Sequence, residues 1–434
     1  MALNCTSAAI PFPSVFGAEI LGLQATLVTN LTENIAPGFY SNHGGVSIKG
    51  LDFCNVTVTY THPGRNDNIN VQVWLPADGT WNERLQTQGG SGYQAGLHYA
   101  GLQAMKAAMG EGYATAGTDA GLGSEVTPVN WGLVSPGNPN LNLLENLGST
   151  SLNETAVISK SVIRSFYGQP PKFSYFNGCS QGGRQGYLLA QRYPEAYDGI
   201  AASAPAINWN KFFVSSLYSL FLMDSLNYAP PPCEISAFTA AAIAACDGND
   251  GVLDCIISDA ESCTFDPMSL VGTVIDNCTD FGTPLTITTE AATIVAGAVS
   301  PPTPICNTYV FLTLSMSQWG GAKRADGSRI WFGVNKDATL VGSQTDGAVI
   351  PTTCSGSTCV RGTNALSESW VGPFLYKDMT AVFANVSQVE FDRIAQTSFQ
   401  QYASFLETAD ADLSAFRDRG GKMLGYHGMV SCLS

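Results

Sequence analysis

The chain has 434 residues, of which 45% are hydrophobic and 13% are charged, and it is long enough to bury a large core in one or two domains. Its formal net charge is −15, and the sequence contains no block of lysine or arginine. We therefore expect it to bind neither nucleic acid nor anionic membranes. No apolar run approaches the length of a transmembrane helix, so we expect no membrane anchoring.

Cysteine usage indicates an oxidising compartment. The chain has 12 cysteines and no Cys-x-x-Cys pair that would suggest zinc. Six Asn-x-Ser/Thr sequons agree with export, and we expect a secreted glycoprotein modified at Asn4, Asn30, Asn55, Asn153, Asn277 and Asn385. The first thirty residues lack the layout of a signal peptide, so we expect that a leader has been trimmed and replaced by Met1 or that the start is assigned wrongly.

The first predicted elements are strands. Residues 46–51 and 56–60 alternate between apolar and polar positions, and 69–76 forms a further strand that ends at a proline. These segments are typical of an antiparallel hairpin at the start of a mixed sheet. A disulfide between Cys5 and Cys54 would join the N-terminal arm to it.

A strand over residues 81–88 then enters the glycine-rich loop at residues 89–93. A phosphate-binding loop is disfavoured, because no lysine follows at the required spacing. An ordinary flexible turn is the other alternative. Next come a buried strand over residues 113–121 and an amphipathic helix over residues 154–167.

The next segment carries the chemistry. An aromatic strand ends in Gly178-Cys179-Ser180-Gln181-Gly182, and residues 184–192 are predicted to be helical. This arrangement is typical of a nucleophile elbow, in which a strained serine lies at a tight strand-to-helix turn between two small residues. In such a fold the amides of Gln181 and of the glycine-rich loop, at Gly90 and Ser91, would form the oxyanion hole. The alternative is a plain turn serine.

Residues 177–186, Ala190-Gln191-Arg192-Tyr193-Pro194, Asp198-Gly199-Ile200 and Ala204-Pro205-Ala206 closely resemble the tannase and feruloyl esterase family of secreted α/β-hydrolases. The resemblance implies an α/β fold with a large inserted lid domain that carries a calcium loop. We therefore expect the first part of the catalytic domain at residues 1–206, the lid at 207–395, and an incomplete return to the catalytic domain at 396–434.

The calcium loop is expected at residues 246–257, where three carboxylates occur within eight residues. Oxygen ligands on a short glycine-bearing loop suit Ca²⁺. The resemblance implies a structural Ca²⁺ held by the side chains of Asp247, Asp250 and Asp254 and by the carbonyls of Val252 and Ile256. It also implies a Cys246–Cys263 disulfide across the loop. A solvated acidic turn is the alternative.

The triad is expected to be incomplete. In the family the strand that ends at His427 is soon followed by the triad aspartate and later by a His-Cys pair, but here Ser431 stands at the place of the acid and no later histidine follows. Cys432 is a doubtful partner for Cys179. The other histidines, His43, His62 and His98, precede the serine, so none has the expected order. We expect a family member cut short at its C-terminus.

The sequence thus predicts a secreted serine carboxylic-ester hydrolase that cleaves phenolic esters through an acyl-enzyme on Ser180. The substrate would be a feruloylated plant polysaccharide or a tannin, and the sequence does not separate the two. The alternative is a catalytically inactive, calcium-stabilised secreted binding protein, which the missing acid and base favour.

Overall fold

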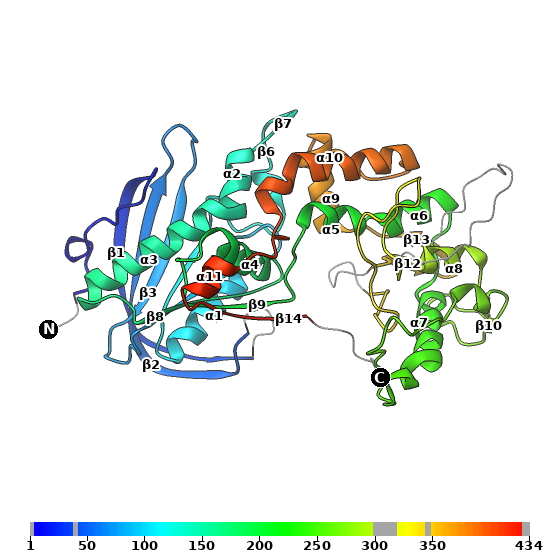
Figure 1. Cartoon of the computed structure of the whole chain (residues 1–434), viewed down its shortest axis with the longest axis horizontal. Helices are drawn as coiled ribbons and strands as arrows, with labels where there is room; N and C mark the ends of the chain where they lie inside the picture. Colours follow the sequence, from blue (N-terminus) through cyan, green and yellow to red (C-terminus); the bar gives the residue numbers. More distant parts are fainter. Residues whose placement is uncertain (1–3, 38–41, 298–318, 343–348, 428–434) are drawn as a thin grey trace. The chain divides into compact units, whose positions relative to one another are not determined.

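A computed structural model describes residues 4–37, 42–297, 319–342 and 349–427 (Figure 1). By its internal contacts the chain divides into two compact units. The first runs to Trp209 and resumes at Tyr402–His427, and the second spans Asn210–Gln401. No described helix is long and apolar enough to cross a bilayer.

The first unit is built on one large sheet. Its strands are β1 (Glu19–Ile35), β2 (Val46–Thr61), β3 (Ile69–Pro76), β4 (Arg84–Gln88), β5 (Ala114–Thr118), β8 (Phe173–Cys179), β9 (Gly199–Ser203) and β14 (Lys422–Tyr426). A separate small hairpin pairs β6 (Leu133–Ser135) with β7 (Asn138–Pro139). The helices are η1 (Ser7–Ala9), α1 (Tyr99–Gly110), η3 (Pro128–Asn130), α2 (Leu141–Glu145), the π-helical turn η4 (Asn146–Thr150), α3 (Ser151–Tyr167), α4 (Gln181–Arg192) and α11 (Ser414–Asp418).

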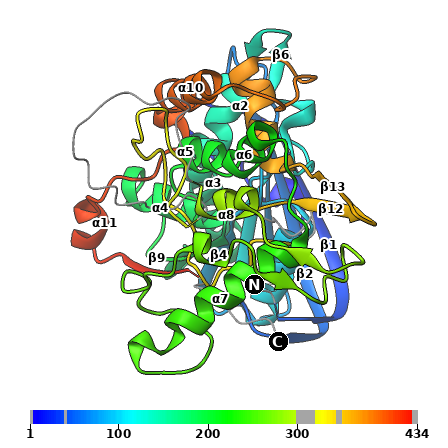
Figure 2. The same ribbon diagram turned by 90° about the vertical axis from the view of Figure 1, so that its right-hand side faces the viewer.

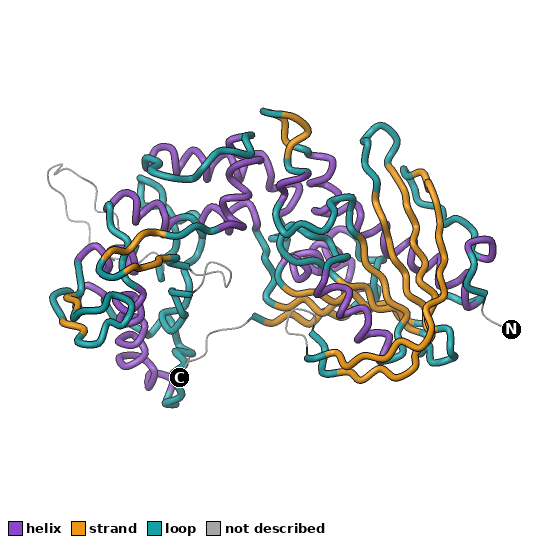
Figure 3. The backbone as a smooth tube through the Cα atoms, turned by 180° about the vertical axis from the view of Figure 1, so that it is seen from behind, coloured by secondary structure: helices purple, strands orange, loops and turns teal. Residues whose placement is uncertain are grey.

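The spatial order of the large sheet is β1-β2-β3-β5-β4-β8-β9-β14. Figure 3 shows strands of this sheet in orange with helices in purple beside them. The strands from β1 to β5 pair antiparallel, whereas β5, β4, β8, β9 and β14 pair parallel in succession. The carboxyl ends of the parallel strands therefore meet at one edge of the sheet. In α/β sheets this edge is where ligand-binding loops gather.

Two apolar layers cover the faces of this sheet. On one face α3 and α4 contribute buried side chains such as Ile158, Val162 and Leu189 to a cluster with β2, β3 and β5. On the other face Met105 and Met109 of α1 pack against the outer strands at Phe53 and Trp74. The mixed sheet with helices on both faces agrees with the α/β class expected from the sequence.

Two local expectations differ from the structure. Residues 46–51 and 56–60 form one continuous strand, β2, rather than two. The seventeen-residue strand β1 was not predicted at all. It is the first strand of the sheet, and only Leu23 and Ile35 are buried along it, so its sequence carries little apolar alternation. A disulfide joins Cys5 to Cys54 on β2.

The second unit is mainly helical, with small hairpins (Figure 2). Its elements are α5 (Trp209–Ser215), α6 (Tyr218–Leu226), α7 (Pro232–Cys246), η5 (Asp247–Asp250), η6 (Pro267–Leu270), β10 (Val274–Ile275), β11 (Leu285–Thr286), α8 (Thr289–Ala296), β12 (Thr352–Ser355), β13 (Thr358–Arg361), α9 (Ala365–Trp370), η8 (Val371–Tyr376) and α10 (Gln388–Leu406), which continues into the first unit. Disulfides join Cys233 to Cys278, Cys246 to Cys263, and Cys354 to Cys359.

Candidate active site

Ser180 occupies the turn between β8 and α4, at the carboxyl edge of the sheet. Its backbone has φ 59° and ψ −116°, a conformation that a residue with a side chain adopts only under strain. The strain is tolerated because the two flanking glycines let the backbones cross. A Cβ atom on Gly178 would lie 2.5 Å from the carbonyl carbon of Gly182. The segment therefore has the geometry of a nucleophile elbow.

Backbone hydrogen bonds hold the elbow in this conformation. The Ser180 N–H donates to the carbonyl oxygen of Ser203 (3.1 Å), and the Ser180 carbonyl accepts from Arg184 and Ala206 (3.0 Å each). Ser180 precedes the first residue of α4, so the positive end of the helix dipole lies beside it. The amide of Gln181 belongs to this helix terminus, which favours the predicted oxyanion role.

The glycine-rich loop packs against the start of α4, backbone to backbone. The Gly182 N–H donates to the Gly90 carbonyl (3.0 Å), and a Cβ atom on Gly89 would lie 2.7 Å from the Cα of Gly182. The Gly90 N–H, however, donates to Gln185 Oε1 (2.8 Å). This engagement corrects the expectation that Gly90 supplies an oxyanion amide, and it leaves Ser91 as the candidate donor of the loop.

Arg184 lies one turn into α4 and is fully buried. Its guanidinium donates to Gln181 Oε1 (2.7 Å) and to the carbonyls of Gly148 (3.0 Å) and Leu147 (3.0 Å) in η4. Burial lowers the pKa of Arg184 to about 9, so the group keeps its charge at neutral pH. The arginine thus ties the helix that follows Ser180 to a π-helical turn, and it lends positive potential to the site.

The histidines that precede the serine are engaged elsewhere. His62 is buried between Asp67 and Glu154, with Nδ1 2.6 Å from Asp67 Oδ2 and Nε2 2.8 Å from Glu154 Oε1. The His43 ring bonds the carbonyl of Gly44 (2.7 Å). Neither contact leads to Ser180.

His98 precedes α1 and lines a small cavity together with Gly90, Ser91 and Cys179. Burial lowers its pKa, against a hydrogen bond with the Gly89 backbone that raises it. Cys179 is buried and forms no disulfide with any cysteine in the described ranges. The glycine-rich loop therefore forms part of the wall of this cavity.

His427 directly follows β14. The sheet registers align Cys179 with Ser203 and Ser203 with Tyr426, so Ser180, Ala204 and His427 follow three neighbouring strands. The structure thus places His427 at the same sheet edge as the serine, two strands away. Ser431, which stands at the place expected for the acid, and Cys432, the doubted partner of Cys179, lie outside the described residues.

The acidic loop of the second unit follows α7. Asp247 Oδ1 accepts from the amide of Asp254 (3.2 Å), Asp250 Oδ1 from that of Val252 (2.9 Å), and Asp254 Oδ1 from that of Ile256 (3.1 Å). The carboxylates therefore cap backbone turns. Across residues 4–427, leaving out the undescribed gaps, no three or more His, Cys, Asp or Glu side chains form a group that could hold a metal ion. The expected convergence of three carboxylates is absent, although their oxygen chemistry suits Ca²⁺.

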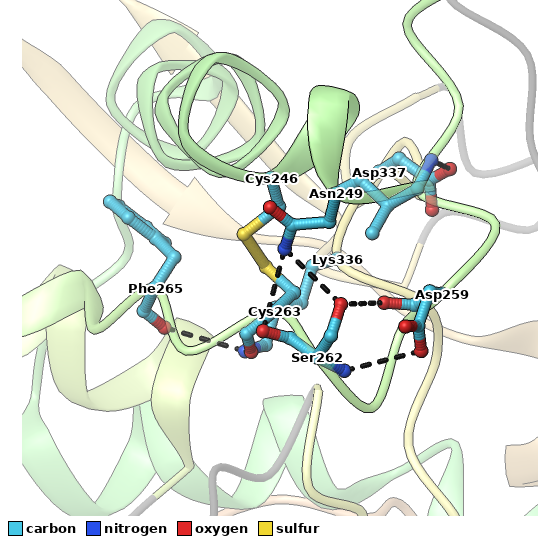
Figure 4. Close-up of a disulfide and its surroundings, with 9 residues drawn as sticks. Cys246, Asn249, Asp259, Ser262, Cys263, Phe265, Lys336 and Asp337 are labelled. Atoms are coloured by element: carbon cyan, nitrogen blue, oxygen red, sulfur yellow. Dashed lines mark hydrogen bonds between the residues drawn. A yellow bond between two sulfur atoms is a disulfide. The ribbon is translucent and has the colours of Figure 1, made fainter. Parts of the chain in front are cut away.

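The surroundings of this loop are firmly connected (Figure 4). The Cys246–Cys263 disulfide joins the end of α7 to the segment after the loop. The Lys336 ammonium donates to the carbonyl of Cys263, and the buried Asp337 accepts from the amide of Ile257 (2.9 Å). These contacts thus hold the loop backbone at both ends.

The sequons differ in accessibility. Asn4, Asn30, Asn277 and Asn385 are exposed, whereas Asn55 and Asn153 are half-buried. Asn55 lies inside β2 and is paired with β1 on one side and β3 on the other, and Asn153 lies in α3. Glycan addition favours surface loops, so these two sites are the weaker candidates.

Two contributing side chains were not assigned a role from the sequence. Arg184 and Gln185 both lie within the family-like segment at residues 177–186. Arg184 bonds η4, 36 residues away, and Gln185 bonds the glycine-rich loop, 95 residues away. The sequence did offer one signal for both residues: each is a hydrogen-bonding side chain on the predicted helix that follows the serine.

Comparison with known proteins gives a consistent result. A family model described as "Tannase and feruloyl esterase" matches residues 54–431. A "Probable feruloyl esterase" of Arthroderma benhamiae is 34% identical over 433 residues, covering 98% of this chain and 73% of the relative. A "Tannase" of Aspergillus oryzae is 27% identical with the same two coverages. The solved structure of a tannin acyl hydrolase from Aspergillus niger has a TM-score of 0.76 and 26% identity, covering 97% of this chain and 72% of that one.

Proposed function

Because the chain belongs to the tannase and feruloyl esterase family of carboxylic ester hydrolases with an α/β-hydrolase fold, we propose that it cleaves phenolic esters through an acyl-enzyme on Ser180. The observation that carries the proposal is the strained backbone of Ser180 at the turn between β8 and α4, beside a glycine-rich loop. Turns with this backbone conformation ordinarily have glycine there, so a serine in its place indicates a functional reason for the strain.

In the proposed reaction Ser180 Oγ attacks the ester carbonyl and loses its proton to a base. The developing oxyanion accepts hydrogen bonds from the Gln181 and Ser91 amides, and collapse of the intermediate expels the alcohol, which takes up a proton. Water then attacks the acyl-enzyme in the same way and releases the acid. His427 is the candidate base that the sheet registers favour, because it lies at the same edge as Ser180.

We further propose that the substrate is a feruloyl or galloyl ester from plant polysaccharide or tannin, and that the second unit acts as a lid that selects it. The names of the relatives support this substrate class. The four disulfides among the described residues support export, because such bonds persist in oxidising compartments.

The decisive experiment measures hydrolysis of methyl ferulate and methyl gallate by the 434-residue chain, its Ser180→Ala variant and its His427→Ala variant. The proposal expects turnover that Ser180→Ala abolishes. Loss in His427→Ala as well would assign the base. Turnover that survives Ser180→Ala in the purified chain would overturn the proposed mechanism.

A second candidate is a binding protein that holds aryl esters without turnover. It is favoured by one observation: His43 bonds the Gly44 carbonyl and His62 bonds Asp67 and Glu154, and none of these contacts leads to Ser180. Calorimetry with methyl ferulate would distinguish the two, since binding heat without product formation by a folded chain would support this candidate.

A further inference from the structure

Gln185 connects the helix of the nucleophile to both ends of the glycine-rich loop. Its side chain is fully buried. Oε1 accepts from the Gly90 N–H (2.8 Å), and Nε2 donates to the Ala95 carbonyl (3.0 Å). One amide group therefore spans the loop from Gly90 to Ala95 and satisfies a backbone donor and a backbone acceptor at once.

The consequence for the site concerns one peptide plane. The Gly90 carbonyl and the Ser91 N–H belong to the same planar peptide unit. Gly182 N–H fixes this unit from its carbonyl side (3.0 Å), and Gln185 fixes the preceding amide of Gly90. Together the two contacts determine where the Ser91 N–H points, although neither touches Ser91 itself.

The two glycines at the start of the loop are closely packed. A Cβ atom on Gly90 would lie 1.9 Å from the carbonyl oxygen of Gln94, and one on Gly89 would lie 3.0 Å from Gln185 Oε1. Gly89 and Gly90 therefore pack as bare backbone against the glutamine amide and the far end of the loop, whereas the middle of the loop is held by hydrogen bonds from the Tyr93 N–H to the Val126 carbonyl (3.1 Å) and from the Gln94 N–H to the Ser91 carbonyl (3.0 Å). Glycine backbone has high conformational freedom, so its order has to come from such contacts.

We propose that Gln185 is a positioning residue for the oxyanion hole, which holds the Gly90–Ala95 loop so that the Ser91 amide is preorganised toward the reacting carbonyl. The inference rests on the proposed serine-esterase function. Preorganised donors act on the transition state more than on the bound ester. Loss of the contact should therefore lower kcat and leave KM nearly unchanged.

The test compares Gln185→Met, which keeps the length of the side chain and removes both hydrogen bonds, with Gln191→Ala. Gln191 lies on the same helix and also bonds backbone carbonyls, those of Thr408 and Asp410 (2.8 Å each), but it lies away from the loop. Methyl ferulate kinetics and inhibition by an aryl boronic acid are measured for each folded variant. We expect Gln185→Met to lower kcat by about tenfold or more, to weaken boronate inhibition in proportion, and to change KM by less than about twofold. Gln191→Ala should keep all three values.

A third variant, Gln185→Glu, keeps the measurement informative if Gln185→Met does not fold. A protonated carboxyl group has both an acceptor and a donor, whereas the carboxylate only accepts. Its kcat relative to the parent should therefore rise as the pH falls from 7 to 5. A pH-independent ratio near one would overturn the proposal.

Failure of this inference is distinguishable from failure of the proposed function. If Ser180→Ala abolishes turnover but Gln185→Met keeps kcat within twofold, only the positioning role is overturned. If the parent chain shows no Ser180-dependent turnover, the proposed function fails. Hydrogen exchange of the peptide covering residues 88–97 then decides the loop contact: faster exchange in Gln185→Met than in Gln191→Ala supports it, and equal exchange overturns it.

Discussion

The imidazole Nδ1 of His62 lies 2.6 Å from the Asp67 carboxylate, and both side chains are buried within the first unit. On its other side Nε2 meets Glu154 of α3, which also accepts from the Tyr60 hydroxyl (2.7 Å). Asp67 further accepts from Asn146 (2.9 Å) and from the His62 amide (2.8 Å). A histidine held between two carboxylates therefore joins the β2–β3 hairpin to α3.

This cluster predicts that stability depends on pH. Burial alone would lower the pKa of His62, but its hydrogen bonds to Asp67 and Glu154 and the negative charge of these carboxylates outweigh burial and raise the pKa above its usual 6.5. Its contribution is thus fully present below pH 6.5 and is lost as the pH rises through the raised value. Burial raises the pKa of Asp67, but the hydrogen bonds that the carboxylate accepts lower it to below 3.8. The stability that the Asp67 charge contributes is therefore present above pH 3.8 and is lost as the pH falls through the lowered pKa.

His62→Gln should therefore lower Tm more at pH 5 than at pH 8. At pH 5 it leaves two buried carboxylates without their cation, at a cost of about 3–5 kcal/mol. Calorimetric melting across this range measures the difference, with His43→Gln as the control because that ring bonds only a neighbouring carbonyl. A Tm difference that stays constant with pH would contradict the raised pKa of His62.

Gly178→Ala should prevent the elbow from forming. The added methyl would lie 2.5 Å from the backbone of Gly182, and two crossing backbones have no flexible atom that could move aside. We expect loss of esterase activity and a stability cost of about 1–3 kcal/mol. Gly22→Ala on β1 is the matched control, because a Cβ there meets nothing within 4 Å. Near-parental activity of the Gly178 variant would argue against the elbow geometry.

The Cys5–Cys54 disulfide should be a main support of the N-terminal arm. The bond closes a loop with a sequence separation of 49 residues, and its loss should cost about 2–4 kcal/mol. The double variant Cys5→Ser/Cys54→Ser is compared with the parent by thermal and urea unfolding. The short Cys354–Cys359 loop, with a separation of 5, should give a smaller effect when it is removed in the same way. Equal losses would contradict this explanation.

Calcium binding by the acidic loop remains a prediction. If it is correct, titration of the chelator-treated chain with CaCl₂ should release or absorb heat and raise Tm, and Asp254→Asn should abolish both effects. Asp259→Asn is the control, since that exposed carboxylate caps a separate turn at Ser262. Absence of any response in the parent chain would overturn the calcium prediction and leave the carboxylates with their hydrogen bonds to the loop amides.

Glycan occupancy should follow exposure. In a chain secreted from a eukaryotic host we expect modification at the exposed Asn4, Asn30, Asn277 and Asn385 and an unmodified Asn55, whose strand is paired on both sides. Peptide mass spectrometry after enzymatic release in heavy water reads each site separately. Full occupancy at Asn55 would mean that β2 forms after the glycan is attached.

The elbow and the strands of the inner sheet could be predicted because their signals are local. Gly178 and Gly182 are required by a backbone crossing within five residues, and β3 alternates against a buried core. The contacts that organise the site could not be predicted from the sequence. Gln185 meets Gly90 across 95 residues and His62 meets Glu154 across 92, so their partners exist only after the sheet has brought distant segments together. For the same reason the sequence did not reveal that the Gly90 amide is engaged or that β1 borders the sheet, because both depend on neighbours supplied by the folded chain.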